Sequence, residues 1–296
     1  MKYRHILLAF ASEYWAMEEC KLFAIIDLLA AQADGIKFDA AEIEARITPQ
    51  TAAAVARREG SVAIVPLRGV ISNRINLTPN SSTGGGTSAE AFANAIERAG
   101  ADDTVKAVVV DADTPGGNVQ GVEEAAAAIA SLRGRKPVVV QVNGNLASAG
   151  YWIGSAADEI VATPSSALGA IGVRTAYDNI IGALEKQGVE REVFSAGKYK
   201  GEGVLGPLSD DARAHIQSTV DEYYTMFVDR VAQGRNVSSD TVRNGFGEGR
   251  MVSASQAVKL GMADRIGTMA ETLARFTSTS SGSGSRARRE RALALL

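Results

Sequence analysis

Three short runs of β-branched and apolar residues constrain the fold of this chain most. They are VAIVPLRGVI at 62–71, AVVVDAD at 107–113 and PVVVQV at 137–142. Runs this short and this apolar are typical of strands that are buried on both faces of a sheet. Helical segments separate them, so consecutive strands need crossover connections. The sequence therefore predicts an α/β fold built on a largely parallel sheet.

The helices between these strands are marked by their first residues. One is expected to begin at Thr87-Ser88, where Thr87 and Glu90 have the spacing of a capping box, and another covers VEEAAAAIASL at 122–132. Further along, EIVATP at 159–164 and EVFSA at 192–196 are strand candidates. A long helix is predicted from about 209 to 232, with core residues at helical spacing: Val220, Tyr223, Tyr224 and Phe227.

The chain divides into three parts by composition. Residues 1–58 are expected to form a helical N-terminal preface, in which one amphipathic helix carries Leu22, Ile25, Ile26 and Leu29 and ends near Gly35. A second helix is capped by Thr48, has Pro49 in its first turn and runs to Gly60. Residues 59–270 form the α/β domain. Residues 271–296 contain the flexible linker TSTSSGSGS and the basic tail RARRERALALL.

Charge and composition exclude several classes of protein. A net charge of −3 with mixed signs gives no general attraction to nucleic acid, except in the tail. The longest early apolar run, Ile6 to Ala11, is too short to span a membrane and lacks a signal-peptide cleavage pattern. Cys20 is the only cysteine and cannot form an intramolecular disulfide. We expect a cytoplasmic protein without a membrane anchor.

No cofactor or metal motif stands out in the sequence. The glycines at 84–86 lie in the segment NLTPNSSTGGGTS at 76–88, which lacks the lysine and serine that end a phosphate-binding P-loop. A loop or lid is the better interpretation of that segment. We therefore expect neither a cofactor nor a metal.

The stretch GNLASAGYWIG at 144–154 places one hydroxyl, Ser148, among residues too small to bury much. A serine nucleophile needs such space for a substrate backbone, together with a base and an oxyanion hole. If Ser148 begins a helix, the amide of Ala149 supplies one oxyanion donor. The turn DTPGGNV at 113–119 suggests the second donor, with Gly117 as first choice and Gly116 as second.

The base is harder to find, because the chain has two histidines and both are poorly placed. His5 lies in the preface and His215 lies inside the long helix. The segment AGKYKGEG at 196–203 offers two lysines instead, Lys198 and Lys200. A lysine acts as a base near neutral pH only when burial lowers its pKa from about 10.4. Serine–lysine pairing is a known variant of the catalytic triad.

Five motifs in one order resemble the S49 peptidases, the signal peptide peptidase A family. They are DTPGGNV, LASAGYWIGSAADEIVATP, LGAIGV, SAGKYKGEGVLGPLSDDAR and GRMVSASQAVKLGMADRIG, within residues 61–268. The resemblance implies a fold of repeated ββα units like that of Clp-type peptidases and crotonases. It assigns Ser148 as the nucleophile and Lys200 as the general base. Lys198 falls on a variable position and is the second choice.

Three positions depart from the family pattern. The usual S-G-G around the nucleophile is Ser148-Ala149-Gly150 here, which adds only a methyl group. Ala170 stands where some members have a serine that orients the lysine, and Gly201 replaces a frequent aspartate. Another group must therefore hold Lys200, and the candidates are a water molecule or one of Thr163, Ser165 and Ser166.

The preface, with its motif EYWAMEECKLFAIIDLLA, resembles the leader of phage and prophage head-maturation proteases. This resemblance implies scaffold, portal or the protease itself as substrates, a ring-shaped homo-oligomer, and action in the host cytoplasm or procapsid interior. Three alternatives remain open. They are a housekeeping peptidase that degrades signal peptides, a crotonase-like acyl-CoA enzyme, and an assembly factor without catalysis.

Overall fold

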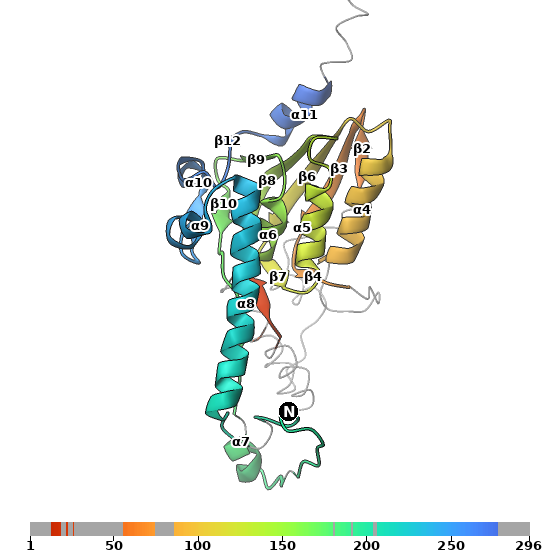
Figure 1. Cartoon of the computed structure of the whole chain (residues 1–296). Helices are drawn as coiled ribbons and strands as arrows, with labels where there is room; N and C mark the ends of the chain where they lie inside the picture. Colours follow the sequence, from red (N-terminus) through yellow and green to blue (C-terminus); the bar gives the residue numbers. More distant parts are fainter. Residues whose placement is uncertain are drawn as a thin grey trace, which may run out of the picture.

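The computed structural model describes residues 13–18, 22, 26, 56–74, 86–179, 181–190, 192–203 and 206–277. Its centre is a largely parallel sheet with helices packed on it, so the predicted α/β class is confirmed (Figure 1). The predicted apolar runs form its middle, as β3 (Val62–Arg68), β6 (Ala107–Thr114) and β8 (Val138–Ala147). These strands pair in parallel, β3 with β6 and β6 with β8.

Shorter strands complete the sheet on both sides. Its order is β11-β10-β8-β6-β3-β2, and β9 pairs with β8 and β12. The outer strands β2 and β11 run antiparallel to their neighbours. The bounds of these short strands are β2 Arg57–Glu59, β9 Glu159–Ala162, β10 Ala167–Gly169, β11 Met251–Ser253 and β12 Arg265–Ile266.

A second, smaller sheet lies beside the end of β6. Its order is β1-β7-β4-β5, and β7 is made of the two glycines and the asparagine that follow Pro115. β1 runs antiparallel to β7, and β4 runs parallel to both β7 and β5. The bounds are β1 Trp15–Met17, β4 Ile71–Ser72, β5 Thr87–Ser88 and β7 Gly116–Asn118.

The buried side chains of the central sheet form separate clusters on its two faces. Val65 and Leu67 of β3 belong to the main cluster with the helices, whereas Val62 and Ile64 pack with Leu273 on the opposite face. Successive side chains of a strand point to opposite faces, which explains the division. The helices on the first face are α4 Ala89–Ala101, α5 Val122–Ala130, α6 Ala149–Gly154 and α8 Asp210–Arg235.

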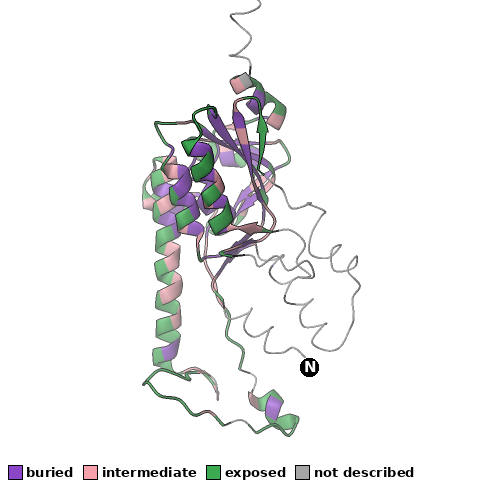
Figure 2. Cartoon of the chain, turned by 90° about the vertical axis from the view of Figure 1, so that its right-hand side faces the viewer, coloured by how far each residue is buried: buried purple, intermediate pink, exposed green. Residues whose placement is uncertain are grey.

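Helix α8 is packed on the domain along only part of its length. Its second half contributes Phe227, Val228 and Val231 to the core, but Ala212 is the only buried residue of the first half. That half extends away from the sheet, and α7 (Ile181–Lys186) also lies beyond the domain in this direction, apart from α8 (Figures 1 and 2). We call residues 174–212 the arm. After α8 the chain returns to the domain in α9 (Ser239–Gly245) and α10 (Ala254–Leu260).

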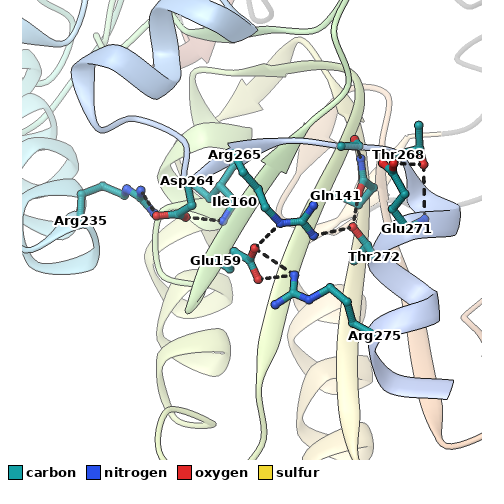
Figure 3. A network of polar contacts seen from close by, with 11 residues as sticks. Gln141, Glu159, Ile160, Arg235, Asp264, Arg265, Thr268, Glu271, Thr272 and Arg275 are labelled. Atoms are coloured by element: carbon teal, nitrogen blue, oxygen red, sulfur yellow. Dashed lines mark hydrogen bonds and ion pairs between the residues drawn. The ribbon is translucent and has the colours of Figure 1, made fainter. Parts of the chain in front are cut away.

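Helix α11 (Met269–Thr277) covers the second face of the sheet and is fixed by polar contacts (Figure 3). Glu159 of β9 accepts hydrogen bonds from Arg265 at 2.7 Å and from Arg275 at 2.7 and 2.9 Å. The buried Thr272 donates to Gln141 at 2.7 Å. The packed part of the chain therefore includes α11 and reaches the point after Phe276 at which the sequence predicts the flexible linker.

Four local predictions differ from the structure, and tertiary pairing explains most of them. Residues 57–59, expected to end a helix, form the edge strand β2 against β3. The preface contributes strand β1, and within it only Leu22 and Ile26 are described as helical, while Thr48 and Pro49 lie outside the described residues. Thr87 bonds Arg68, so Ser88 caps α4 instead. Residues 192–196 form no strand.

The contact between α6 and α8 yields the first prediction. A Cβ on Gly234 would lie 2.0 Å from the Ser155 carbonyl oxygen, which is backbone and cannot turn away. We expect Gly234→Ala to lower the free energy of unfolding by about 1–3 kcal/mol. Gly245→Ala is the matched control, because its nearest atom is 3.8 Å away and alanine favours a helix over glycine. Urea denaturation measures both variants, and equal stability would contradict the close contact.

Candidate active site

Ser148 stands where strand β8 turns into helix α6, as the sequence predicted. β8 ends at Ala147 and α6 begins at Ala149, so Ser148 is the N-cap residue. Its backbone has φ 51° and ψ −119°, a left-handed conformation that side chains with a Cβ rarely adopt. The Ser148 amide donates to the Gly169 carbonyl at 2.7 Å. Strain at a single serine on a strand-to-helix turn indicates a functional position.

Of the two glycines predicted to supply an oxyanion donor, Gly116 lies against this serine and Gly117 follows it in β7. A Cβ on Gly116 would lie 2.9 Å from the Cβ of Ser148 and 2.2 Å from the carbonyl oxygen of Ala16. A Cβ on Gly117 would lie 1.8 Å from the carbonyl oxygen of Ile71. Only glycine permits such an approach, because any side chain would collide with backbone. The structure thus brings Gly116 and Ser148 together.

Ala149 begins α6 directly after Ser148, as its proposed role as an amide donor requires. It is fully buried. Gly150 follows with no space for a side chain, since its Cβ would lie 2.3 Å from Thr114 Cγ2. Small residues are therefore needed here for packing as well as for access. The hydroxyl of Thr114 also accepts from the Gly116 amide at 3.1 Å, which fixes the start of β7.

Tyr151 and Trp152 belong to the core behind the serine and do not line a pocket. Both are fully buried. The Tyr151 hydroxyl donates to the Met262 carbonyl at 2.9 Å, and burial raises the pKa of this hydroxyl above its ordinary value. The Trp152 ring stacks on Phe227 of α8, with centroids 4.7 Å apart. Its indole N–H donates to Glu123 at 2.9 Å, and Glu123 is bonded in turn by Arg230.

Lys200 lies on the arm, in an exposed turn between α7 and α8. Its amide donates to the Gly197 carbonyl at 3.0 Å, and its side chain is exposed. Lys198 is also exposed and has its ammonium group 4.6 Å from the centre of the Tyr199 ring. In the described part of the chain, no hydrogen bond joins the Ser148 hydroxyl to either lysine. One copy of the chain therefore does not bring the predicted nucleophile and base together.

Two of the three side chains considered as supports for Lys200, Thr163 and Ser166, form hydrogen bonds elsewhere in this copy, and the third, Ser165, is exposed. Thr163 and Ser166 share a hydrogen bond of 2.6 Å, and Ser166 also bonds the Val142 carbonyl at 3.0 Å. Ala170 has φ 52°, and its amide donates to the Arg250 carbonyl at 3.0 Å. His215 is exposed on the first half of α8, as expected for a residue without a role in the site. His5 lies outside the described residues.

The sequence did not reveal that β1 lies at this site. Trp15, Ala16 and Met17 pair with Asn118, Gly117 and Gly116 respectively, so the N-terminal segment runs along the glycine strand. Ser148 is only 1% exposed. A strand of three residues is too short to show an alternation of apolar and polar residues. Its partner strand, β7, lies about a hundred residues later in the chain. No local signal announces such a pairing.

Two further searches concern the described residues alone. They contain no group of three or more His, Cys, Asp and Glu side chains placed to hold a metal ion. None of the helices in the described ranges combines the length and the low polarity that a membrane crossing requires.

Comparison with known proteins gives one family and several relatives. The sequence profile of Peptidase family S49 matches residues 130–281. "Capsid assembly protease C" of Escherichia phage lambda is 34% identical over 207 residues, which are 69% of this chain and 46% of the relative. "Head-tail preconnector protein GP5" of Enterobacteria phage P21 is 29% identical over 216 residues, 72% of this chain and 42% of the relative. The chain spans about half the length of the curated relatives it matches.

Among solved structures, a ClpP1 mutant from Listeria monocytogenes is similar with a TM-score of 0.43. It is 14% identical, and the match covers 69% of this chain and 91% of that one.

The backbone of Ser148 yields the second prediction. An L-residue with a Cβ in the left-handed region carries a strain of about 1–2 kcal/mol, from which glycine is free. Ser148→Gly and Ser148→Ala both remove the hydroxyl, but only the first removes the Cβ. We therefore expect Ser148→Gly to unfold at a higher urea concentration than Ser148→Ala, by about 1 kcal/mol. The reverse order would show that the serine is unstrained.

Proposed function

The chain belongs to the S49 peptidase family, and from this premise we propose that it is a serine endopeptidase with Ser148 as nucleophile and Lys200 as base. One observation carries the proposal: a serine with a left-handed backbone begins a helix and touches a strand of two glycines. A nucleophile among main-chain amides and small residues suits attack on a peptide carbonyl.

The chemistry follows from the groups around Ser148. A neutral Lys200 amine accepts the hydroxyl proton while the serine oxygen attacks the substrate carbonyl carbon. The amides of Ala149 and Gly117 stabilise the negative charge on the carbonyl oxygen. Gly116, the second choice after Gly117, already donates its amide to Thr114 and would first have to release that bond. Lys200 then returns the proton to the leaving amine. The same lysine then takes a proton from water, which attacks the acyl carbonyl carbon. The bond to the Ser148 oxygen breaks, Lys200 returns the proton to that oxygen, and the product acid leaves.

The exposed arm implies that the dyad forms between two copies of the chain. An exposed ammonium group is fully charged near neutral pH and is no base, so Lys200 requires burial by a neighbour. The arm also exposes large apolar side chains, among them Phe194 at 91% and Tyr199 at 57%. Exposed apolar groups gathered on one element are typical of an association surface. A ring of identical subunits would cover them and bring each Lys200 to a neighbour's Ser148.

For the substrates, we propose capsid-assembly proteins such as scaffold, portal or the protease itself. Support comes from the names of two relatives, a capsid assembly protease of phage lambda and a head-tail preconnector protein of phage P21. The setting would be the host cytoplasm or the procapsid interior. Mass spectrometry of products from co-expressed head proteins tests this choice. Cleavage of signal peptides alone would favour the housekeeping peptidase, and head assembly by an inactive chain would favour the assembly factor.

The third prediction concerns the dyad itself. We expect Ser148→Ala and Lys200→Ala each to reduce peptide hydrolysis by at least about a thousandfold, because each removes a group that the chemical step needs. Lys198→Ala is the matched control, since it removes the same charge two residues away and should retain nearly full activity. Initial rates on a fluorogenic peptide library measure all three variants. Activity near that of the wild type in either dyad variant would refute the assignment.

The fourth prediction concerns sharing of the dyad between subunits. When the inactive Ser148→Ala and Lys200→Ala chains are mixed and allowed to exchange subunits, some interfaces regain both groups. We expect a substantial fraction of the wild-type rate to return, because one intact Ser148 then meets an intact Lys200 from the other chain. Mixing Ser148→Ala with a Ser148→Ala/Lys200→Ala double variant is the control without recovery. If the two single variants exchange subunits but stay inactive, each dyad lies within one chain.

A further inference from the structure

Strand β1 occupies a position beside Ser148 that is suited to an extended peptide. Its backbone is bonded along both edges. On one edge Trp15 exchanges two hydrogen bonds with Arg174, N–H to carbonyl at 2.9 Å and carbonyl from N–H at 3.1 Å. On the other edge the Tyr14 carbonyl accepts from Val119 at 3.2 Å, and the Glu18 amide donates to Pro115 at 2.7 Å. A peptide held this way is recognised through its main chain.

The register of β1 places one carbonyl next to the predicted nucleophile. Backbone groups alternate between the two edges of a strand, so Ala16 faces β7, as Tyr14 and Glu18 do. Ala16 lies opposite Gly117. Its carbonyl oxygen and the Ser148 Cβ both lie within 3 Å of the point that a Cβ on Gly116 would occupy. The Ala16 carbonyl therefore lies beside the serine and beside the glycine strand from which the second oxyanion donor is predicted.

We propose that residues 14–18 occupy the substrate site of Ser148 in the same chain, as an intramolecular competitor of peptide substrates. This inference rests on the proposed peptidase function and adds its mode of substrate binding and its regulation. This placement explains the burial of Ser148, because β1 lies against the serine and covers it. Substrates gain access when β1 leaves.

The occupied site also indicates which peptides it accepts. The Ala16 side chain is fully buried in the main core cluster, whereas Trp15 and Met17 pack in a separate cluster with Leu22. An extended peptide in this register thus has a small residue at the position of Ala16, between two positions that take large apolar ones. The chemical class is an extended chain of the form large–small–large.

Glu18, the residue directly after β1, has one polar atom that the bound position of the strand leaves unsatisfied. In the described structure, its Oε2 atom is buried without a hydrogen-bond partner. A buried carboxylate oxygen without a donor loses its hydration and gains nothing in return. The buried Glu18 oxygen therefore adds an unfavourable free-energy term to the bound position of β1. Release of β1 returns this oxygen to water and removes that term, which makes the strand easier to displace.

The test uses the full chain with Ala16→Asp. A carboxylate cannot occupy the fully buried position of Ala16, so β1 should leave the groove. We expect kcat/KM for a peptide substrate to rise by about tenfold or more, because the fraction of open chains rises. Labelling of Ser148 by a fluorophosphonate, followed by intact mass, should accelerate similarly. Ala91→Asp is the matched control, an exposed position in the first turn of α4 that should change neither rate.

A synthetic peptide tests the site independently of the folding of that variant. The peptide SEYWAMEE, residues 12–19, should inhibit hydrolysis by Ala16→Asp, and by the wild type at higher concentrations. The same peptide with Ala16→Leu should inhibit neither, because the bulky side chain replaces the small one. If Ala16→Asp does not fold, inhibition of the wild type by the first peptide alone supports the proposal.

The outcomes separate this inference from the proposed function. Unchanged rates in a folded Ala16→Asp chain, with no inhibition by the peptide, overturn the competitor while inactivity of Ser148→Ala still upholds the peptidase. Activity in Ser148→Ala overturns both. Equal inhibition by the alanine and leucine peptides overturns the requirement for a small residue and the register on which it depends.

Discussion

The close approach of backbones at Gly116 and Gly117 is the constraint on which the rest of this site depends. Strand β7 lies so near to Ile71, Ala16 and Ser148 that a single methyl group at either glycine would overlap with backbone or side-chain atoms. Main-chain amides can therefore reach a bound carbonyl without a side chain between them. The same constraint explains the small residues around Ser148: bulk there would separate the surfaces that must touch.

The part of the fold that the sequence predicted is the part fixed by local composition. The apolar runs of β3, β6 and β8 are buried on both faces, and burial of this kind is visible in the residues themselves. The turn from β8 into α6 at Ser148 was predictable because an apolar strand is followed there by a run of small residues. By contrast, β1, β2 and β5 are short edge strands whose pairing depends on distant residues. Alanine-rich residues before Gly60 favour a helix in isolation, but pairing with β3 makes Arg57–Glu59 a strand.

Sequence reasoning placed part of the candidate site correctly, namely the residues that neighbouring elements of one chain bring together. Gly116, Ala149 and Ser148 come together because β7 and α6 both follow strands of the same sheet. Lys200 does not join them, and its neighbourhood shows why. The pattern EVFSA has the composition of a strand, yet in one copy Phe194 is exposed and pairs with nothing in the described residues. The ring of identical subunits proposed above would cover Phe194 and would change the surroundings of Lys200, which a single chain leaves exposed.

The part of α8 that follows the arm is connected to the helix of Ser148 through packed side chains. Trp152 lies one turn after Ser148 on α6 and stacks on Phe227, at the point where α8 leaves the domain. Glu123 of α5 binds both Trp152 and Arg230 of α8, so three helices meet at one carboxylate. Tyr14, next to β1, packs edge-on against Tyr223 of the same helix, with centroids 5.3 Å apart. A movement of α8 on assembly would therefore act on the helix of the nucleophile and on the strand that covers it.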